Sequence, residues 1–144
     1  MSRPSVYAFV YGTLKRHGAL NYHLGSMGGA FISDATLEGH ALYDLGWFPA
    51  IAADADQRVH GELWKIPEEG LDTLDRVEGA PALYTREKVR VYTPAHPRGV
   101  GHRGFYYDIP STPAWAYIWS GTAGHLPNDK KILSGRWPVD GGSD

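Results

Sequence analysis

Residues 6–14 read VYAFVYGTL, and this stretch decides the fold. Its first six residues are all apolar, β-branched or aromatic, a pattern typical of a strand buried on both faces. Gly12 ends the run. A glycine at this position permits an otherwise strained turn and a close approach of the backbone to a ligand. Exposed N–H groups at residues 11–14 would form a small anion-binding nest, which suits a substrate carboxylate or an oxyanion. An ordinary strand-to-helix turn is the simpler interpretation of these four residues alone.

Working outward, six further runs have the composition of strands, and most are separated by Gly, Pro or Asp clusters. They are residues 30–32, 35–43, 48–53, 59–66, 84–93 and 114–119. Two windows are helical: residues 67–78, with a proline at the first position and Gly79 as the stop, and residues 127–133. Residues 13–29 hold at most one more helical turn. The pattern predicts an α+β fold, a small mixed β-barrel with peripheral short helices.

The composition limits the class of protein. A chain of 144 residues with 42% apolar content fits one domain over residues 1–144. Fourteen basic against sixteen acidic residues give a net charge of −2, which offers no footprint for nucleic acid or an anionic membrane. The absence of cysteine excludes disulfides, thiolate metal sites and cysteine nucleophiles. No apolar run approaches the roughly 20 residues of a membrane span, so we expect a soluble cytoplasmic protein.

Residues 95–113 are rich in Gly and Pro and predict a loop insertion between strands. Within them, GVGHRG at 99–104 has the letters of a dinucleotide-binding fingerprint. That motif requires a buried strand before it and a helix after it, and neither pattern is present. The seven histidines are scattered without metal-ligand spacing. We therefore expect neither a cofactor nor a metal ion.

Glu78 is a candidate for proton transfer. It ends the helical window 67–78 on the apolar face of that window, so we expect it to point toward the interior or a pocket. The negative end of the helix dipole and apolar neighbours both disfavour the ionised carboxylate. A carboxyl with a raised pKa can exchange protons near neutral pH. A surface glutamate, or one paired with Arg76 or Arg86, is an equally good interpretation of its position.

Taken in order, these segments resemble the γ-glutamylcyclotransferase-like family. That family includes γ-glutamylamine cyclotransferases, AIG2-like proteins of plants and the cyclotransferase of butirosin biosynthesis. The resemblance covers about residues 6–137, and the order and spacing of its pieces are specific. The pieces are VYGTLKRHG at 10–18, LYD at 42–44, PAI at 49–51, VHGELW at 59–64, LDRVEG at 74–79, YTR at 84–86, AYIW at 116–119 and SGRW at 134–137.

The resemblance implies a compact barrel with a pocket at the end of the first strand. It implies that Glu78 is the catalytic acid and base. It also implies that the γ-glutamyl group is bound by residues at that pocket, which are Tyr11, Gly12, Thr13 and Leu14, with Tyr84 and Tyr117 as recurrent aromatic neighbours. The insertion at residues 95–113 departs from the family pattern and is either a solvated surface loop or a lid that selects the leaving group.

The implied reaction is intramolecular and needs no cofactor. The α-amine of a small-molecule γ-glutamyl amide attacks the γ-carbonyl, and 5-oxoproline and a free amine or amino acid are released. Two alternatives remain at this stage: a hydrolase that releases glutamate from the same amides, and a non-catalytic module that binds a small ligand on the same fold. We expect a monomer or weak homodimer, with no nucleic acid and no membrane among its partners.

Overall fold

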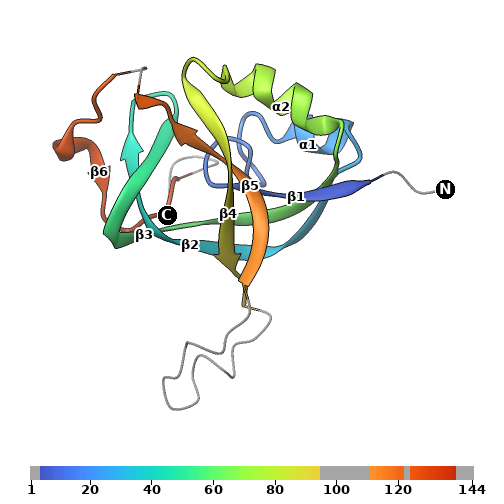
Figure 1. Cartoon of the computed structure of the whole chain (residues 1–144), viewed down its shortest axis with the longest axis horizontal. Coiled ribbons are helices and arrows are strands. Elements are labelled where there is room, and N and C mark those ends of the chain that lie inside the picture. Colours follow the sequence, from blue (N-terminus) through green and yellow to red (C-terminus); the bar gives the residue numbers. More distant parts are fainter. Residues whose placement is uncertain (1–3, 95–110, 122–123, 139–144) are drawn as a thin grey trace, which may run out of the picture.

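The computed structural model describes residues 4–94, 111–121 and 124–138 (Figure 1). The 99–104 motif and most of the predicted insertion lie outside these residues. The elements run in the order β1 (Ser5–Val10), α1 (Tyr22–Ser26), β2 (Ala30–Asp44), β3 (Pro49–Pro67), α2 (Gly70–Glu78), β4 (Tyr84–Tyr92), β5 (Ser111–Trp119), the 3-10 turn η2 (Asn128–Lys130) and β6 (Lys131–Ile132).

Among the described residues, five strands close into a mixed β-barrel. The strand order is β3–β1–β5–β4–β2, and β2 pairs back with β3 to complete the circle. The pairs are antiparallel apart from β1 and β5, which run parallel. The short β6 adds to β2 outside the barrel, and α1 and α2 lie together over one end of it (Figure 1). The predicted α+β class, a small mixed β-barrel with peripheral short helices, is confirmed.

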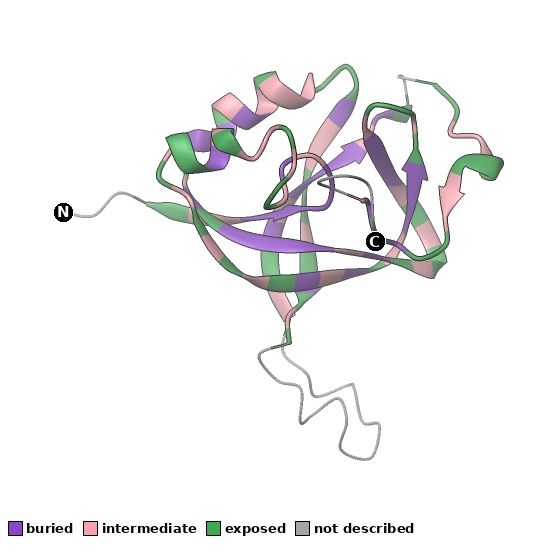
Figure 2. Cartoon of the chain, turned by 180° about the vertical axis from the view of Figure 1, so that it is seen from behind, coloured by how far each residue is buried: buried purple, intermediate pink, exposed green. Residues whose placement is uncertain are grey.

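Strand β1 is buried on both faces, as its composition predicts. Alternate residues of a strand point to opposite faces, so Phe9 belongs to the cluster inside the barrel while Ala8 and Val10 pack on the outer side. The outer cluster includes Leu24 of α1 and Leu74 of α2, both fully buried. The buried residues therefore follow the barrel strands and the inner faces of the two helices (Figure 2). This packing fixes the end of β1 beneath α2.

Several predicted boundaries are wrong in ways that have physical reasons. Residues 30–32 and 35–43 form one strand, β2, because a register shift between Phe31 and Ser33 absorbs the polar break. Residues 48–53 and 59–66 likewise join in β3, with a second register shift between Glu38 and His40 of β2 opposite the polar stretch. Polar residues in an exposed part of a long hairpin resemble a loop in sequence although they continue the strand.

The helices are shorter than predicted. The helix expected from residue 67 begins at Gly70, because Pro67 still pairs with Ser5 in the β3–β1 ladder. Residues 127–133 give only η2 and β6, and the weak signal in residues 13–29 gives α1. The last three residues of the predicted insertion, 111–113, begin β5 and pair with β4. None of the helices within the described residues has the length and apolar character that crossing a membrane requires.

Candidate active site

A cavity of about 210 Å³ opens where β1 ends. It is bounded by the loop after β1, the last turn of α2, the start of β4 and the middle of β5. The structure brings all seven predicted site residues together on its wall: Tyr11, Gly12, Thr13, Leu14, Glu78, Tyr84 and Tyr117. Seven further lining residues are apolar and resemble core in the sequence: Phe9, Val10, Leu20, Phe48, Pro49, Val77 and Leu83. The structure thus shows that the seven predicted site residues lie close together, whereas their roles in binding and catalysis stay predictions.

The loop after β1 lines this cavity with Gly12, Thr13 and Leu14. Its turn is closed by the N–H of Lys15 donating to the carbonyl of Gly12 at 3.0 Å, and by Leu20 donating to Thr13 at 2.9 Å. Among the described residues, no hydrogen bond uses the N–H of Gly12, Thr13 or Leu14 as donor. Unpaired N–H groups in succession attract a carboxylate. That this loop forms an anion-binding nest stays a prediction.

Gly12 is required by close packing. A Cβ at this position would lie 2.4 Å from Cγ of Pro49, far inside any permitted contact. Pro49 is buried, and its carbonyl accepts the hydroxyl of Tyr84 at 2.6 Å, so the ring has little room to move. The absence of a side chain therefore lets the loop pass against Pro49 at the start of β3.

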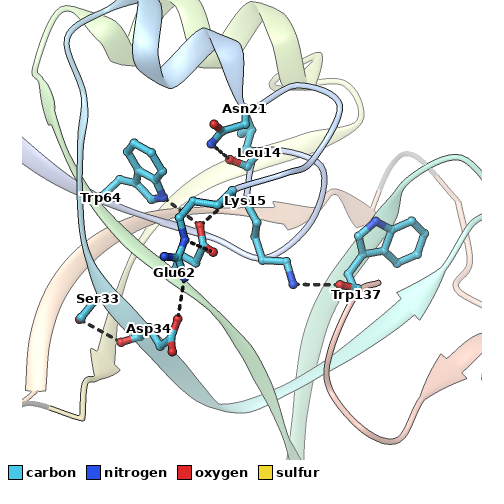
Figure 3. Close-up of polar contacts among 9 residues, drawn as sticks. Leu14, Lys15, Asn21, Ser33, Asp34, Glu62, Trp64 and Trp137 are labelled. Atoms are coloured by element: carbon cyan, nitrogen blue, oxygen red, sulfur yellow. Dashed lines mark hydrogen bonds and ion pairs between the residues drawn. The ribbon is translucent and has the colours of Figure 1, made fainter. Parts of the chain in front are cut away.

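A buried carboxylate anchors the far side of the same loop (Figure 3). Oε1 of Glu62 accepts the backbone N–H of Arg16 at 2.9 Å, and Oε2 accepts Nε of that arginine at 3.1 Å. The indole of Trp64 donates to Oε1 at 3.1 Å. The loop is held elsewhere by the side chain of Asn21, which donates to the carbonyl of Leu14 at 2.8 Å. In the sequence Glu62 is only one residue of the VHGELW segment, and no local pattern there indicates this contact.

Glu78 is the last residue of α2 and faces the cavity. The helix stops there because Gly79 adopts a left-handed φ of 68°, a conformation that glycine takes without strain. Burial raises the pKa of the Glu78 carboxyl from 4.5 to about 7. Within the described residues the carboxyl makes no hydrogen bond or ion pair, so the alternative pairing with Arg76 or Arg86 is not found. A carboxyl with a pKa of about 7 can exchange protons near neutral pH.

Three tyrosines surround this carboxyl, and each uses its hydroxyl proton inside the protein. Tyr11 donates to the carbonyl of Tyr117 at 2.7 Å, and Tyr84 donates to Pro49. Tyr117 donates to Asp75 at 2.6 Å. Burial raises the pKa of all three phenols well above the ordinary value, so they stay protonated. Their oxygens can therefore only accept hydrogen bonds from a bound ligand.

Among the described residues, no group of three or more His, Asp or Glu side chains is arranged to hold a metal ion.

Known proteins share the fold and the sequence pattern of this chain. The crystal structure of an AIG2-like protein from Mus musculus aligns with a TM-score of 0.68 over 89% of this chain and 88% of that one. At 22% identity this likeness shows the fold, which is that of AIG2-like proteins. The family model described as gamma-glutamyl cyclotransferase, AIG2-like, matches residues 8–139. The chain belongs to this family, as the sequence resemblance predicts.

Relatives in bacteria extend the comparison. A Vibrio cholerae protein named "Putative gamma-glutamylcyclotransferase" is 32% identical over 114 residues, which cover 79% of this chain and 82% of that protein. The gamma-glutamylcyclotransferase family protein YtfP of Escherichia coli K12 is 28% identical over 129 residues, covering 90% of this chain and 93% of YtfP. Membership of this family supports an enzymatic role for the chain.

Proposed function

We propose that this protein is a γ-glutamyl cyclotransferase, which releases 5-oxoproline and a free amine or amino acid from a γ-glutamyl amide. One observation carries the proposal. The carboxyl of Glu78, which has no partner within residues 4–94, 111–121 and 124–138, shares a cavity with the N–H groups of residues 12–14, which donate to no acceptor in those same ranges. The first supplies a proton acceptor, and the second supply an anchor for a carboxylate. Those are the two groups that a substrate carrying an α-amine and an α-carboxylate requires.

The cavity suggests how the substrate binds. Its α-carboxylate accepts hydrogen bonds from the N–H groups of residues 12–14. Its α-ammonium lies toward Glu78 and the phenol oxygens of Tyr84 and Tyr117, which can accept its protons. In this pose the γ-glutamyl chain folds back so that its own nitrogen approaches the γ-carbonyl. Holding the two ends together supplies the rate advantage of an intramolecular reaction, and no protein nucleophile is needed.

The chemical step then needs one proton carrier. The carboxylate of Glu78 takes a proton from the α-ammonium, and the neutral amine attacks the γ-carbonyl carbon. The new carbon–nitrogen bond closes the lactam while the bond to the leaving nitrogen breaks. Glu78 returns that proton to the leaving nitrogen, which departs as a free amine. The freed carboxylate then takes the second proton from the ring nitrogen, which leaves the neutral lactam, and releases it to water. A carboxyl whose pKa is about 7 is matched to accept and return a proton at physiological pH.

The direct test is Glu78→Gln. The variant should fold, retain substrate binding and lose turnover by a factor of about 10² or more, since the amide cannot carry the proton. Glu68→Gln, an exposed position just before α2, is the matched control and should keep full activity. Release of 5-oxoproline is followed by mass spectrometry. Full activity in Glu78→Gln would refute the role of this carboxyl.

The same assay separates the alternatives. A hydrolase would release glutamate, which differs from 5-oxoproline by one water. A binding module would be stabilised by γ-glutamyl ligands but release neither product.

A further inference from the structure

A second cavity, of about 940 Å³, lies on the β2–β3 hairpin, and its described lining residues all differ from those of the candidate active site. Two residues of the hairpin, Leu37 and Val59, belong to the cluster inside the barrel. Because alternate residues of a strand point to opposite faces, the adjacent Thr36 and His60 point outward, and both line the second cavity. This cavity therefore lies outside the barrel wall, and it is large enough for a small organic molecule.

The SGRW segment, which follows β6, holds an arginine at this cavity. The backbone N–H of His60 donates to the carbonyl of Gly135 at 2.8 Å, and a Cβ on Gly135 would collide with the carbonyl oxygen of Arg58. Glycine also adopts the φ of 72° found there without strain. Trp137 is buried in the cluster inside the barrel. Arg136 lies between these two fixed residues and lines the second cavity.

The charged groups at the second cavity are mostly paired with one another. Each of its three described acidic side chains has an arginine partner: Glu62 and Asp34 pair with Arg16, at 3.1 Å and 3.5 Å, and Glu38 pairs with Arg58 at 3.5 Å. The guanidinium of Arg136 makes no hydrogen bond or ion pair within residues 4–94, 111–121 and 124–138. Arg136 is exposed, so its side chain can reach a negatively charged group of a ligand.

The imidazole of His60 indicates the sign of the electrostatic potential in this cavity. Its Nδ1 lies 3.2 Å from the hydroxyl of Thr36. Burial lowers the pKa of the imidazole, Arg136 and Arg58 lower it further, and Glu38 opposes them with a smaller effect. The cations therefore outweigh the carboxylate at this ring, and the same potential favours a negatively charged ligand.

We propose that the second cavity binds a phosphate group, either as the free ion or as part of a small organic molecule. The planar guanidinium of Arg136 can bind two phosphate oxygens at once, and phosphate carries more negative charge than a carboxylate. The hydroxyl of Thr36 and the imidazole of His60 are further donors for the remaining oxygens. The pair of Arg58 with Glu38 is more than half exposed on both sides, so this guanidinium can turn to the ligand at small cost.

Calorimetry with inorganic phosphate and with phenyl phosphate measures this binding and identifies the source of the phosphate group. The ring of Tyr92, which is 38% exposed, lines the same cavity and offers a surface for an organic part. Tighter binding of phenyl phosphate would indicate an organic phosphate, whereas equal or tighter binding of inorganic phosphate would indicate the free ion. Binding of neither probe at about 10 mM would overturn the proposal. The measurement needs no turnover, so it is independent of the cyclotransferase proposal.

Removal of one guanidinium tests where the probe binds. Arg136→Gln should raise the Kd of the tighter probe about tenfold or more, because a hydrogen-bonded charge is lost. Arg136 is exposed, and the substitution leaves the core untouched. Arg76→Gln removes the same charge from an exposed position on α2 that lines neither cavity, and it should leave the Kd unchanged. An unchanged Kd in Arg136→Gln, or an equal rise in both variants, would overturn the proposal.

Removal of a carboxylate at the same cavity should have the opposite effect. Glu38→Gln removes a negative charge and frees the guanidinium of Arg58, so it should lower the Kd several-fold. Glu68→Gln makes the same change at an exposed residue that lines neither cavity, and it should have no effect. A phosphate bound instead by the loop after β1 would respond to neither Arg136→Gln nor Glu38→Gln, and that result would overturn the proposal.

Discussion

Glu62 on β3 accepts the backbone N–H of Arg16 at 2.9 Å, and this contact ties the cavity loop to the barrel wall. The carboxylate is buried at 7% exposure, and it also receives the guanidinium of the same arginine and the indole of Trp64. Arg16 in turn lies over the ring of Phe31, with Cζ 3.7 Å from the ring centroid. One side chain thus ties Arg16, and with it the loop that lines the cavity, to the barrel wall.

Replacing this carboxylate should weaken both the fold and substrate binding. Glu62→Ala leaves the N–H and part of the guanidinium of Arg16 without an acceptor, so we expect a loss of about 2 kcal/mol in the free energy of unfolding. The loosened loop should raise KM, because the N–H groups of residues 12–14 lose their fixed position. Urea denaturation and steady-state kinetics measure the two effects.

Glu38→Ala is the matched control for that change. Glu38 pairs with Arg58 at 3.5 Å, but both side chains are more than half exposed, so the pair contributes little. This variant should lose less than about 1 kcal/mol and keep its KM. Equal losses in the two variants would show that Glu62 has no special hold on the loop.

The sequence predicts the parts of the site that local pattern encodes. The run VYAFVYGTL predicts a buried strand and a glycine turn from adjacent residues alone. Helical spacing and the stop signal of Gly79 put Glu78 on the apolar face of its helix, but by position alone a surface glutamate is an equally good interpretation. Their assignment to a shared site came from the resemblance, since the closure of β1, β4, β5 and α2 around one cavity is a property of the barrel as a whole.

Contacts between distant segments escape this reasoning. Glu62 and Arg16 are 46 residues apart, and the sequence around neither residue indicates that they form a pair. The apolar lining of the cavity is not predicted from the sequence for a different reason. Leu20, Phe48 and Leu83 are of the types that build cores, and only the fold shows that they line a cavity instead. Polar residues in the long β2–β3 hairpin cause another error. Such residues are common both in loops and in exposed parts of strands, so the sequence predicts a break where the strand continues.

The activity should depend on the ionisation of Glu78. The general base must be deprotonated, and its pKa is about 7, so kcat/KM should rise between about pH 6 and pH 8 with an inflection near 7. The residual activity of Glu78→Gln should lack this inflection. A profile of 5-oxoproline release against pH provides the measurement. An inflection that persists in the variant would assign the titration to another group.

The free energy of unfolding should also depend on the ionisation of Glu78, but it should fall with rising pH where the activity rises. The pKa of Glu78 is raised from 4.5 to about 7 in the folded protein, so the folded state binds this proton more tightly than the unfolded chain. The stabilisation is fully present below about pH 4.5 and is lost as the pH rises through about 7.

Glu78→Gln resembles the protonated state at every pH and therefore escapes that loss. Its free energy of unfolding relative to the wild type should increase across this pH range, by up to about 3 kcal/mol. Urea denaturation at several pH values measures the difference, with Glu68→Gln as the exposed control. A difference that stays constant with pH would mean that burial does not hold the proton on Glu78.

Gly12→Ala should damage the site through packing alone. The added methyl would lie 2.4 Å from Cγ and 2.9 Å from Cδ of Pro49, so the loop must move away from β3. We expect a loss of about 1–3 kcal/mol in stability and a marked fall in kcat/KM as the N–H groups are displaced.

Gly25→Ala in α1 is the control, because a Cβ there meets nothing within 4 Å. That helical substitution should leave activity unchanged and stabilise the fold by about 0.5–1 kcal/mol. Wild-type stability and kcat/KM in Gly12→Ala would show that the loop tolerates displacement and that its contact with Pro49 does not position the substrate.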